Sequence, residues 1–197
     1  MQIDTSKFGK PGARIAFTKM TGLWQRVVEL TGDPEFGLKV GERVAPGDFF
    51  VLGHAWLASH SLRGALQRLC RYFNVLTTLG HHMGVRDLGD RYALVEDGAN
   101  RLGDPEQVAK DASFVALLRM CDFVTPAPVR PLAVALPQSR DAGPIDYSKV
   151  FGCPVSFDAA EETWEFDKAA LDAPLTGSIP DVADATAGLH RLDAEHE

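Results

Sequence analysis

The sequence predicts an α+β domain in which N-terminal helices pack with an antiparallel sheet of about four to five strands. Two observations lead to this fold class. Apolar residues recur with helical spacing over much of the first 76 residues. Strand-like segments of alternating polarity then follow in pairs, separated by one long and one short helix. Helices and strands do not alternate regularly, so a parallel βαβ sheet is not indicated. The length of 197 residues suits one domain.

The first three helices are predicted from their end signals. An apolar stripe ends at Gly32, which readily takes the left-handed conformation of a helix C-cap. Asp33-Pro34 matches an N-cap followed by proline in the first turn, and predicts a short helix to about Val44. Asp48 is expected to cap a third helix in the segment FFVLGHAWLASH, which is apolar on nearly every side and therefore predicted to be buried.

The longest helix of this half is predicted after Ser61, a favourable N-cap. Its apolar stripe is formed by Leu62, Ala65, Leu66, Leu69, Cys70, Phe73 and Leu76. The segments HHMGVRD and RYALVED then flank a tight Gly-Asp turn and predict a β-hairpin. Asp104-Pro105 predicts the start of another helix, which ends before the proline-rich segment TPAPVRP.

The second half of the chain predicts further strands. PLAVALP is a short apolar run bounded by prolines, which indicates a strand with fixed ends. The apolar residues between Ile145 and Phe151 suggest a short helix or turn. VSFDA and TWEFD alternate in polarity around the polar AEE, and this pattern predicts a second hairpin.

Charge and composition exclude several classes of function. The net charge is −7, and residues 101–197 carry 17 acidic against 8 basic groups, so this chain is expected to repel nucleic acid. We expect no membrane contact, because no apolar run reaches the ~18 residues of a membrane span and the N-terminus lacks the apolar run of a signal peptide. Three widely spaced cysteines fit a reducing compartment, and we predict a cytoplasmic location.

No complete set of catalytic or cofactor-binding residues is present in the sequence. It contains neither the phosphate-binding GxxxxGK[ST] motif nor the GxSxG motif of serine hydrolases. His81 and His82 would point to opposite faces of a strand, and His54 and His60 are not spaced for one helical face. We therefore predict no enzymatic activity, no cofactor and no metal site.

Five residues have two possible interpretations, and the more specific one is that they line a ligand pocket between the helices and the sheet. Arg71, Tyr72 and Asn74 place a cation, a phenol and an amide near the end of an apolar helix, and His54 and Trp56 are expected to line the same pocket from the preceding helix. The ligand would be apolar or amphipathic, for example an amino-acid derivative or a short acid. In the alternative interpretation Arg71 is exposed and Tyr72 is half-buried without a ligand.

Short motifs in a consistent order resemble one protein family over roughly residues 14–176. They are Asp33-Pro34-Glu35-Phe36-Gly37-Leu38, Gly41, Pro46-Gly47-Asp48-Phe49, Leu52-Gly53, Ser61-Leu62, Ala65-Leu66, Leu69, Arg71-Tyr72, the segment from Val134 to Pro137, Tyr147, Phe151-Gly152-Cys153-Pro154-Val155, Phe157, Leu171 and Pro174-Leu175. Because these motifs occur in the same order, the chain resembles the N-terminal effector domain of AraC/XylS-type transcriptional regulators. The resemblance is to the variety of this domain that is called arabinose-binding-like.

The resemblance implies a bacterial sensory domain, formed by residues 1–176, that binds a small-molecule effector and acts as a homodimer. Residues 177–197 would be a linker-like tail toward a helix-turn-helix domain that is absent from this chain, and DNA would be bound only through that domain. The alternative is a structural dimerisation module without a ligand of its own.

Overall fold

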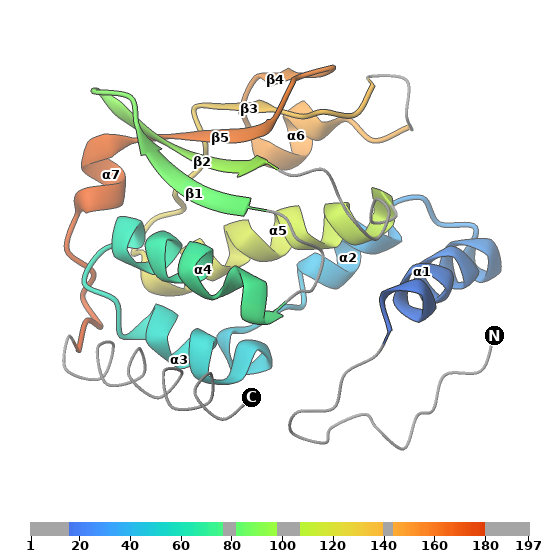
Figure 1. Cartoon of the computed structure of the whole chain (residues 1–197), viewed down its shortest axis with the longest axis horizontal. Helices are drawn as coiled ribbons and strands as arrows, with labels where there is room; N and C mark the ends of the chain where they lie inside the picture. Colours follow the sequence, from blue (N-terminus) through green and yellow to red (C-terminus); the bar gives the residue numbers. More distant parts are fainter. Residues whose placement is uncertain (1–15, 77–81, 98–106, 140–143, 180–197) are drawn as a thin grey trace.

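The computed structural model describes residues 16–76, 82–97, 107–139 and 144–179 (Figure 1). In chain order its elements are α1 Phe17–Thr31, α2 Phe36–Gly41, the 3-10 helix η2 Pro46–Phe49, α3 Phe50–Leu57, α4 Leu62–Leu76, β1 His82–Asp87, β2 Arg91–Asp97, α5 Gln107–Val124, β3 Ala133–Ala135, α6 Tyr147–Phe151, β4 Val155–Ser156, β5 Glu162–Asp167 and α7 Lys168–Asp172. The α+β class is confirmed, as is the number of strands, since five form one sheet. Within the described residues, no helix is both long and apolar enough to cross a bilayer.

Several predicted helix ends are confirmed. Gly32 takes the left-handed conformation with φ of 60° and closes α1. The Ser61 hydroxyl accepts a hydrogen bond from the Gly64 amide at 3.2 Å at the start of α4. The second helix is shorter than predicted, because Asp33 accepts from the Glu35 amide in a turn that precedes α2. Asp104-Pro105 lies outside the described residues.

The sheet has the strand order β1-β2-β5-β3-β4. The predicted hairpin is confirmed, because β1 pairs antiparallel with β2, with His82 opposite Asp97. Its turn contains Gly89 at φ of 96°, and the Gly89 amide donates to the Asp87 carboxylate at 2.8 Å. Glycine adopts a positive φ with little strain because it has no Cβ atom, so this position favours glycine.

The second predicted hairpin is wrong. β5 pairs antiparallel with both β2 and β3, so that Glu165 lies opposite Ala93 on one side and Ala133 on the other. Both edges of β5 are therefore occupied, and β4 instead pairs in parallel with the free edge of β3. Parallel neighbours need a long connection, and the segment that contains α6 provides it. The sheet is consequently mixed, where a wholly antiparallel sheet was predicted.

The core lies between the sheet and the helices α4 and α5, with α3 beyond α4 (Figure 1). Its centre is aromatic: the rings of Phe151 and Trp164 have centroids 4.7 Å apart, and Phe114 of α5 lies 5.7 Å from Phe151. The side chains of Phe151, Trp164 and Phe166 are at most 2% exposed. Burial of side chains of this size provides much of the stability of such a domain.

The prediction that the third helix is buried on nearly every side is wrong for one of its faces. Leu52, Ala55 and Trp56 of α3 are buried, but Phe50 is 72% exposed and His54 is also exposed. The physical reason is position, because the described elements that α3 contacts, α4, η2 and α5, leave these side chains uncovered. Apolar residues on all sides of this short helix therefore did not predict that all of its sides are buried.

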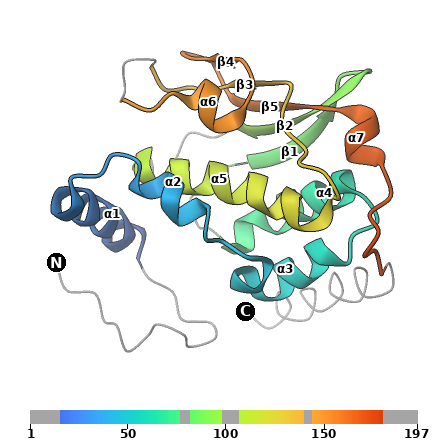
Figure 2. The same cartoon turned by 180° about the vertical axis from the view of Figure 1, so that it is seen from behind.

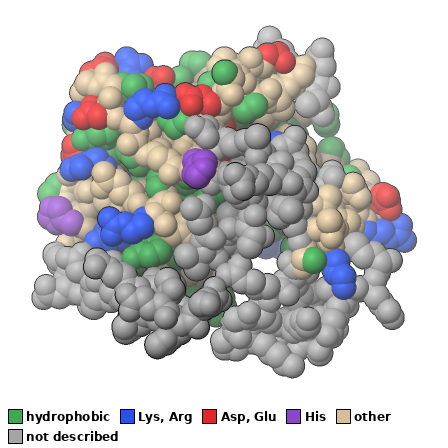
Figure 3. Space-filling view, viewed as in Figure 1, with side chains coloured by type: hydrophobic (Ala, Val, Ile, Leu, Met, Phe, Trp, Pro, Cys, Tyr) green, Lys and Arg blue, Asp and Glu red, His purple; other side chains and the backbone are tan. Residues whose placement is uncertain are grey.

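The face seen in Figure 3 carries acidic and basic side chains next to one another over β1, β2 and α7. Arg86 pairs with Glu161 at 2.8 Å, Lys168 with Asp87 at 2.7 Å, and Arg91 with Glu165 at 2.9 Å. These basic groups are already neutralised by carboxylates. Over β1, β2 and α7, these described residues therefore form no continuous excess of positive charge of the kind that phosphate binding needs.

Glu96 and Glu162 lie directly opposite each other where β2 and β5 pair. This pair makes the free energy of unfolding depend on pH. Burial and the nearby Glu96 carboxylate raise the pKa of Glu162 to about 7, although Trp164 donates to it at 2.9 Å and Lys110 acts in the opposite direction. The folded state thus holds more protons than the unfolded state between the ordinary glutamate pKa and about 7. The free energy of unfolding contributed by this group is largest at acidic pH and is lost as the pH rises through 7.

Replacing Glu162 with glutamine is expected to remove this dependence. The difference in unfolding free energy between Glu162→Gln and the unchanged protein should grow from about pH 5 to about pH 7 and level off above it, with a slope of at most about 1.4 kcal/mol per pH unit. Urea denaturation at several pH values measures it. Glu96→Gln is the matched control, which should shift the dependence to lower pH without abolishing it. A pH-independent difference for Glu162→Gln would contradict the raised pKa.

Candidate functional site

Nucleophilic and metal chemistry find no support in the described residues. Burial raises the pKa of the Cys70 thiol to about 11 and that of the Cys121 thiol to about 12, so both remain protonated and unreactive at neutral pH. In the same part of the chain no three histidine, cysteine, aspartate or glutamate side chains are grouped to hold a metal ion.

The two residues predicted to line a pocket from α3 lie in different environments. His54 is exposed. Trp56 is 1% exposed, and its indole Nε1–H donates to the carbonyl of Met120 in α5 at 2.8 Å. The polar atom of Trp56 is thus engaged by the protein itself, and the ring forms part of the core.

The three residues predicted from α4 lie near its C-terminal end. Arg71 is exposed and Tyr72 is partly buried, while the side chain of Asn74 lies outside the described part. This matches the alternative in which Arg71 faces solvent. His54, Trp56, Arg71 and Tyr72 are not in the described lining of the cavity that follows, and the role of all five residues in ligand binding stays a prediction.

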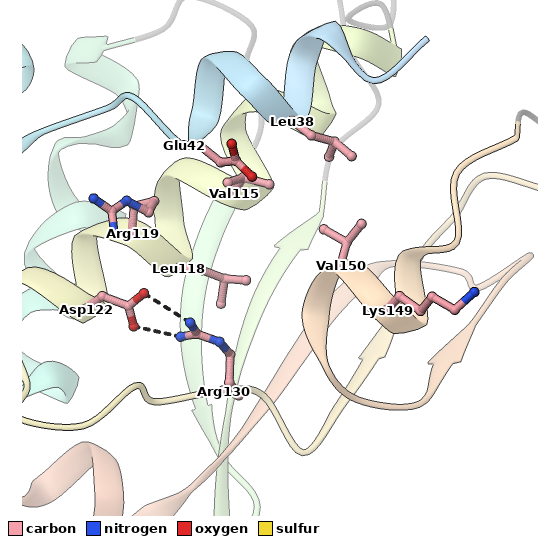
Figure 4. Close-up of a pocket in the computed structure, with 9 residues that line it drawn as sticks. All are labelled: Leu38, Glu42, Val115, Leu118, Arg119, Asp122, Arg130, Lys149 and Val150. Atoms are coloured by element: carbon pink, nitrogen blue, oxygen red, sulfur yellow. Dashed lines mark hydrogen bonds and ion pairs between the residues drawn. The ribbon is translucent and has the colours of Figure 1, made fainter.

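A cavity of about 360 Å³ lies between α2, α5 and α6 (Figure 4). We call it the α2–α5–α6 cavity, and its lining consists of Leu38, Glu42, Val115, Leu118, Arg119, Asp122, Arg130, Lys149 and Val150. Four of these side chains are apolar and five are charged. The lining is therefore more polar than that of most sites for small molecules, and it offers an apolar surface beside charged groups that can orient a ligand.

Close contact between α2 and α5 gives the cavity its shape, and two glycines permit it. A Cβ atom on Gly37 would lie 2.1 Å from the carbonyl oxygen of Val108, and one on Gly41 would lie 2.6 Å from that of Ala112. The glycines are four residues apart and so share one face of α2. Leu38 follows directly, so this contact fixes where its side chain meets the cavity.

An ion pair forms one side of the cavity. The Arg130 guanidinium donates two hydrogen bonds to the Asp122 carboxylate at 2.7 and 3.1 Å and a third to the carbonyl of Val129 at 3.1 Å. The carboxylate of Asp122 raises the pKa of Arg130. A bidentate pair of this kind holds both side chains in a defined orientation, and Figure 4 shows it as dashed lines.

Arg119 is the unusual cation of the lining. Its Nε atom is buried and has no hydrogen-bond partner among the described residues, while its guanidinium lies 5.2 Å from the ring centre of Phe123. A buried donor without a partner destabilises the folded state by about 1–3 kcal/mol. Arginine stays protonated at every relevant pH, so it cannot avoid this destabilisation by losing a proton. An acceptor on a bound molecule would recover that free energy.

Lys149 differs from the other lining cations. It extends away from the remaining lining side chains (Figure 4), is 86% exposed and pairs with Asp146 at 2.9 Å. Arg119 and Arg130, the other two cations of the lining, are less exposed than Lys149. Sequence reasoning missed them, because the lining comes from segments that are far apart in the chain. One local signal was present: the spacing of Gly37 and Gly41 marks a helix face that another backbone can approach closely.

Comparison with known proteins identifies relatives of this chain. The family model described as the arabinose-binding domain of AraC transcription regulators, N-terminal, matches residues 1–175. The ornithine utilization regulator of Pseudomonas aeruginosa is 27% identical over 170 residues, which are 86% of this chain and 50% of the regulator. The chain thus spans about half the length of this curated relative.

A solved structure shares the fold. The transcriptional regulator CdpR of Pseudomonas aeruginosa superposes with a TM-score of 0.65 at 17% sequence identity. The match covers 90% of this chain and 63% of the CdpR chain. At this level of identity the likeness concerns the arrangement of helices and strands.

Proposed function

The chain belongs to the family of arabinose-binding domains that form the N-terminal part of AraC-type transcription regulators, and we propose that it senses a small-molecule effector in the α2–α5–α6 cavity. In this proposal a DNA-binding domain outside this chain contacts the promoter, and the regulator works as a dimer. The observation that carries the proposal is the cavity, whose lining combines four apolar side chains with Arg119, and the buried Nε of Arg119 has no hydrogen-bond partner among the described residues.

The lining favours one chemical class of effector. Leu38, Val115, Leu118 and Val150 offer an apolar surface to the body of a ligand, and Arg119 and Arg130 offer donors to an anionic group. Pairing a carboxylate with Arg119 would satisfy its buried Nε–H, whereas Arg130 is already paired with Asp122. The effector is therefore a small amphipathic molecule with a carboxylate or similar anion, of a size that fits about 360 Å³.

Binding at this place can change the position of α2 against α5. The cavity is bounded by both helices, and α5 also carries core residues such as Phe114 and Leu118. A ligand that binds more tightly to one arrangement of the two helices shifts the population toward it. We propose that this shift is the signal passed to the DNA-binding domain.

A panel of short carboxylates and amino-acid derivatives tests the effector site. At a concentration of 100 times Kd, a bound compound should stabilise the protein by about 2.7 kcal/mol, which differential scanning fluorimetry detects as a higher melting temperature. Arg119→Gln should weaken the binding of the same compound at least about tenfold in calorimetry. Arg43→Gln removes an exposed cation just after α2, outside the lining, and should leave the affinity unchanged.

The outcomes separate effector sensing from the ligand-free alternative. If Arg119→Gln and the unchanged protein bind the compound with equal affinity, the effector does not bind in this cavity. If no compound raises the melting temperature and light scattering shows a stable dimer, the domain is a dimerisation module without a ligand of its own.

A further inference from the structure

A second cavity, of about 610 Å³, lies between α1, α5 and α6. We call it the Asp111 cavity, and its lining consists of Gln25, Val28, Glu29, Pro34, Gln107, Val108, Asp111, Pro144, Ile145 and Tyr147. Its described lining contains two carboxylates and no lysine or arginine. In this respect it is the opposite of the α2–α5–α6 cavity, where cations outnumber carboxylates.

The Asp111 side chain is the feature of this cavity that needs an explanation. Asp111 is only 1% exposed. One of its oxygens accepts from the Tyr147 hydroxyl at 2.6 Å and from the Gln107 amide Nε2 at 2.9 Å. Both donors are neutral. Fully buried carboxylates in proteins are normally paired with a cation, because an isolated negative charge is costly away from water.

Among the described residues, the charged groups around Asp111 do not supply a buried cation. Across the cavity, Glu29 of α1 is 62% exposed and is held by Arg26 at 2.9 Å. Lys110 on α5 lowers the pKa of Asp111 only weakly compared with burial, which raises it. Tyr147 of α6 stays protonated, since burial and the Asp111 carboxyl raise the pKa of its phenol. In the described lining, the titratable groups besides Asp111 are therefore a second carboxylate and a neutral phenol.

We propose that the Asp111 cavity binds a primary alkylammonium group, with the Asp111 carboxylate as its counter-ion. The aliphatic part of such a ligand fits the apolar lining formed by Val28, Val108 and Ile145. The phenol ring of Tyr147 adds an aromatic surface next to the cation. This site is separate from the α2–α5–α6 cavity and does not depend on the proposed effector function.

Binding at this site is linked to the protonation of Asp111. Burial raises the pKa of its carboxyl, while the hydrogen bonds from Tyr147 and Gln107 act in the opposite direction. An alkylammonium ion pairs with the carboxylate form, so a protonated carboxyl must give up its proton to the solvent on binding, while the ammonium group keeps all of its own. The affinity should therefore fall as the pH is lowered into the range in which Asp111 takes up a proton.

Titration calorimetry with n-butylammonium chloride tests the proposal at neutral and at acidic pH. We expect saturable binding at neutral pH, weaker binding at acidic pH, and no binding of n-butanol, which has the same carbon chain without the charge. Asp111→Asn keeps the size of the side chain and can still accept from Tyr147, and should weaken n-butylammonium binding at least about tenfold.

Arg43→Gln serves as the matched control, because the exposed Arg43 belongs to the described lining of neither cavity and its replacement should leave n-butylammonium binding unchanged. The probe carries no anionic group, so it does not test the effector site, and failure of the two proposals is distinguishable. Absence of binding, equal affinity of Asp111→Asn, or equally tight binding of n-butanol would overturn the assignment. If Asp111→Asn does not fold, the pH dependence of the unchanged protein decides, and an affinity that does not fall at acidic pH refutes the role of Asp111.

Discussion

Replacing Gly37 with alanine is expected to destabilise the domain by about 2–3 kcal/mol. The added Cβ atom would lie 2.1 Å from the carbonyl oxygen of Val108, and this neighbour is backbone that cannot rotate away. α2 must therefore move off α5, which opens the packing between the two helices. In an ordinary helix the same substitution stabilises by about 0.5–1 kcal/mol, so the expected sign is reversed by the close contact.

Urea denaturation of two variants checks this result. Gly64 lies in α4, and a Cβ atom there meets its nearest neighbours at 3.6 Å, which is ordinary contact. Gly64→Ala should therefore keep or raise the stability, whereas Gly37→Ala should lower it. If both variants gain stability alike, the packing of α2 on α5 is looser than described. Gly37→Ala should also displace Leu38 and Glu42 and weaken ligand binding in the α2–α5–α6 cavity.

Local patterns predicted the elements of this fold well, because their signals act over a few residues. The stripe that includes Leu62 and Leu66 predicted a buried helix face, and both residues are fully buried. The turn at Gly89 and the cap at Ser61 were predicted from side-chain and backbone chemistry that depends on neighbours alone. Where the residues in contact are close in sequence, periodicity and capping suffice.

Long-range pairing was not predictable in this way. The alternation in VSFDA and TWEFD correctly predicted strands, but their neighbours in the sheet were decided by β2 and β3, far away in the chain. The same limit applies to the candidate site. Leu38, Arg119 and Val150 meet at one cavity only after α2, α5 and α6 have packed, and no local pattern relates them.

The motifs that carried the family resemblance now have structural roles, which explains why they predicted fold better than ligand contacts. Gly37 and Gly41 permit the α2–α5 contact, Gly152 closes α6 with φ of 70°, and Leu171 is 1% exposed. Leu175 donates its amide to the His60 carbonyl at 2.8 Å and so ties the segment after α7 to the start of α4. These residues are in the described lining of neither cavity, whereas three other motif residues are: Leu38 lines the α2–α5–α6 cavity, and Pro34 and Tyr147 line the Asp111 cavity.

Trp56 is expected to show the largest effect of any substitution considered, with Trp56→Ala costing about 3–5 kcal/mol of unfolding free energy. The ring is 1% exposed within the core, and its indole N–H donates to the Met120 carbonyl at 2.8 Å, which ties α3 to α5. Trp56→Phe keeps most of the apolar contact and loses the hydrogen bond, so it should cost about 1–2 kcal/mol. Guanidinium denaturation of both variants measures the two contributions separately.

The same pair of variants separates a core role from the predicted ligand role of Trp56. If the residue only supports the core, Trp56→Phe folds and binds any effector with unchanged affinity once the protein is fully native. A loss of affinity in the folded Trp56→Phe protein, together with a loss in His54→Ala, would place an effector at α3 as the sequence predicted. His54 is the informative partner because it is exposed, so its replacement leaves the core intact and any change in affinity reports contact with the ligand.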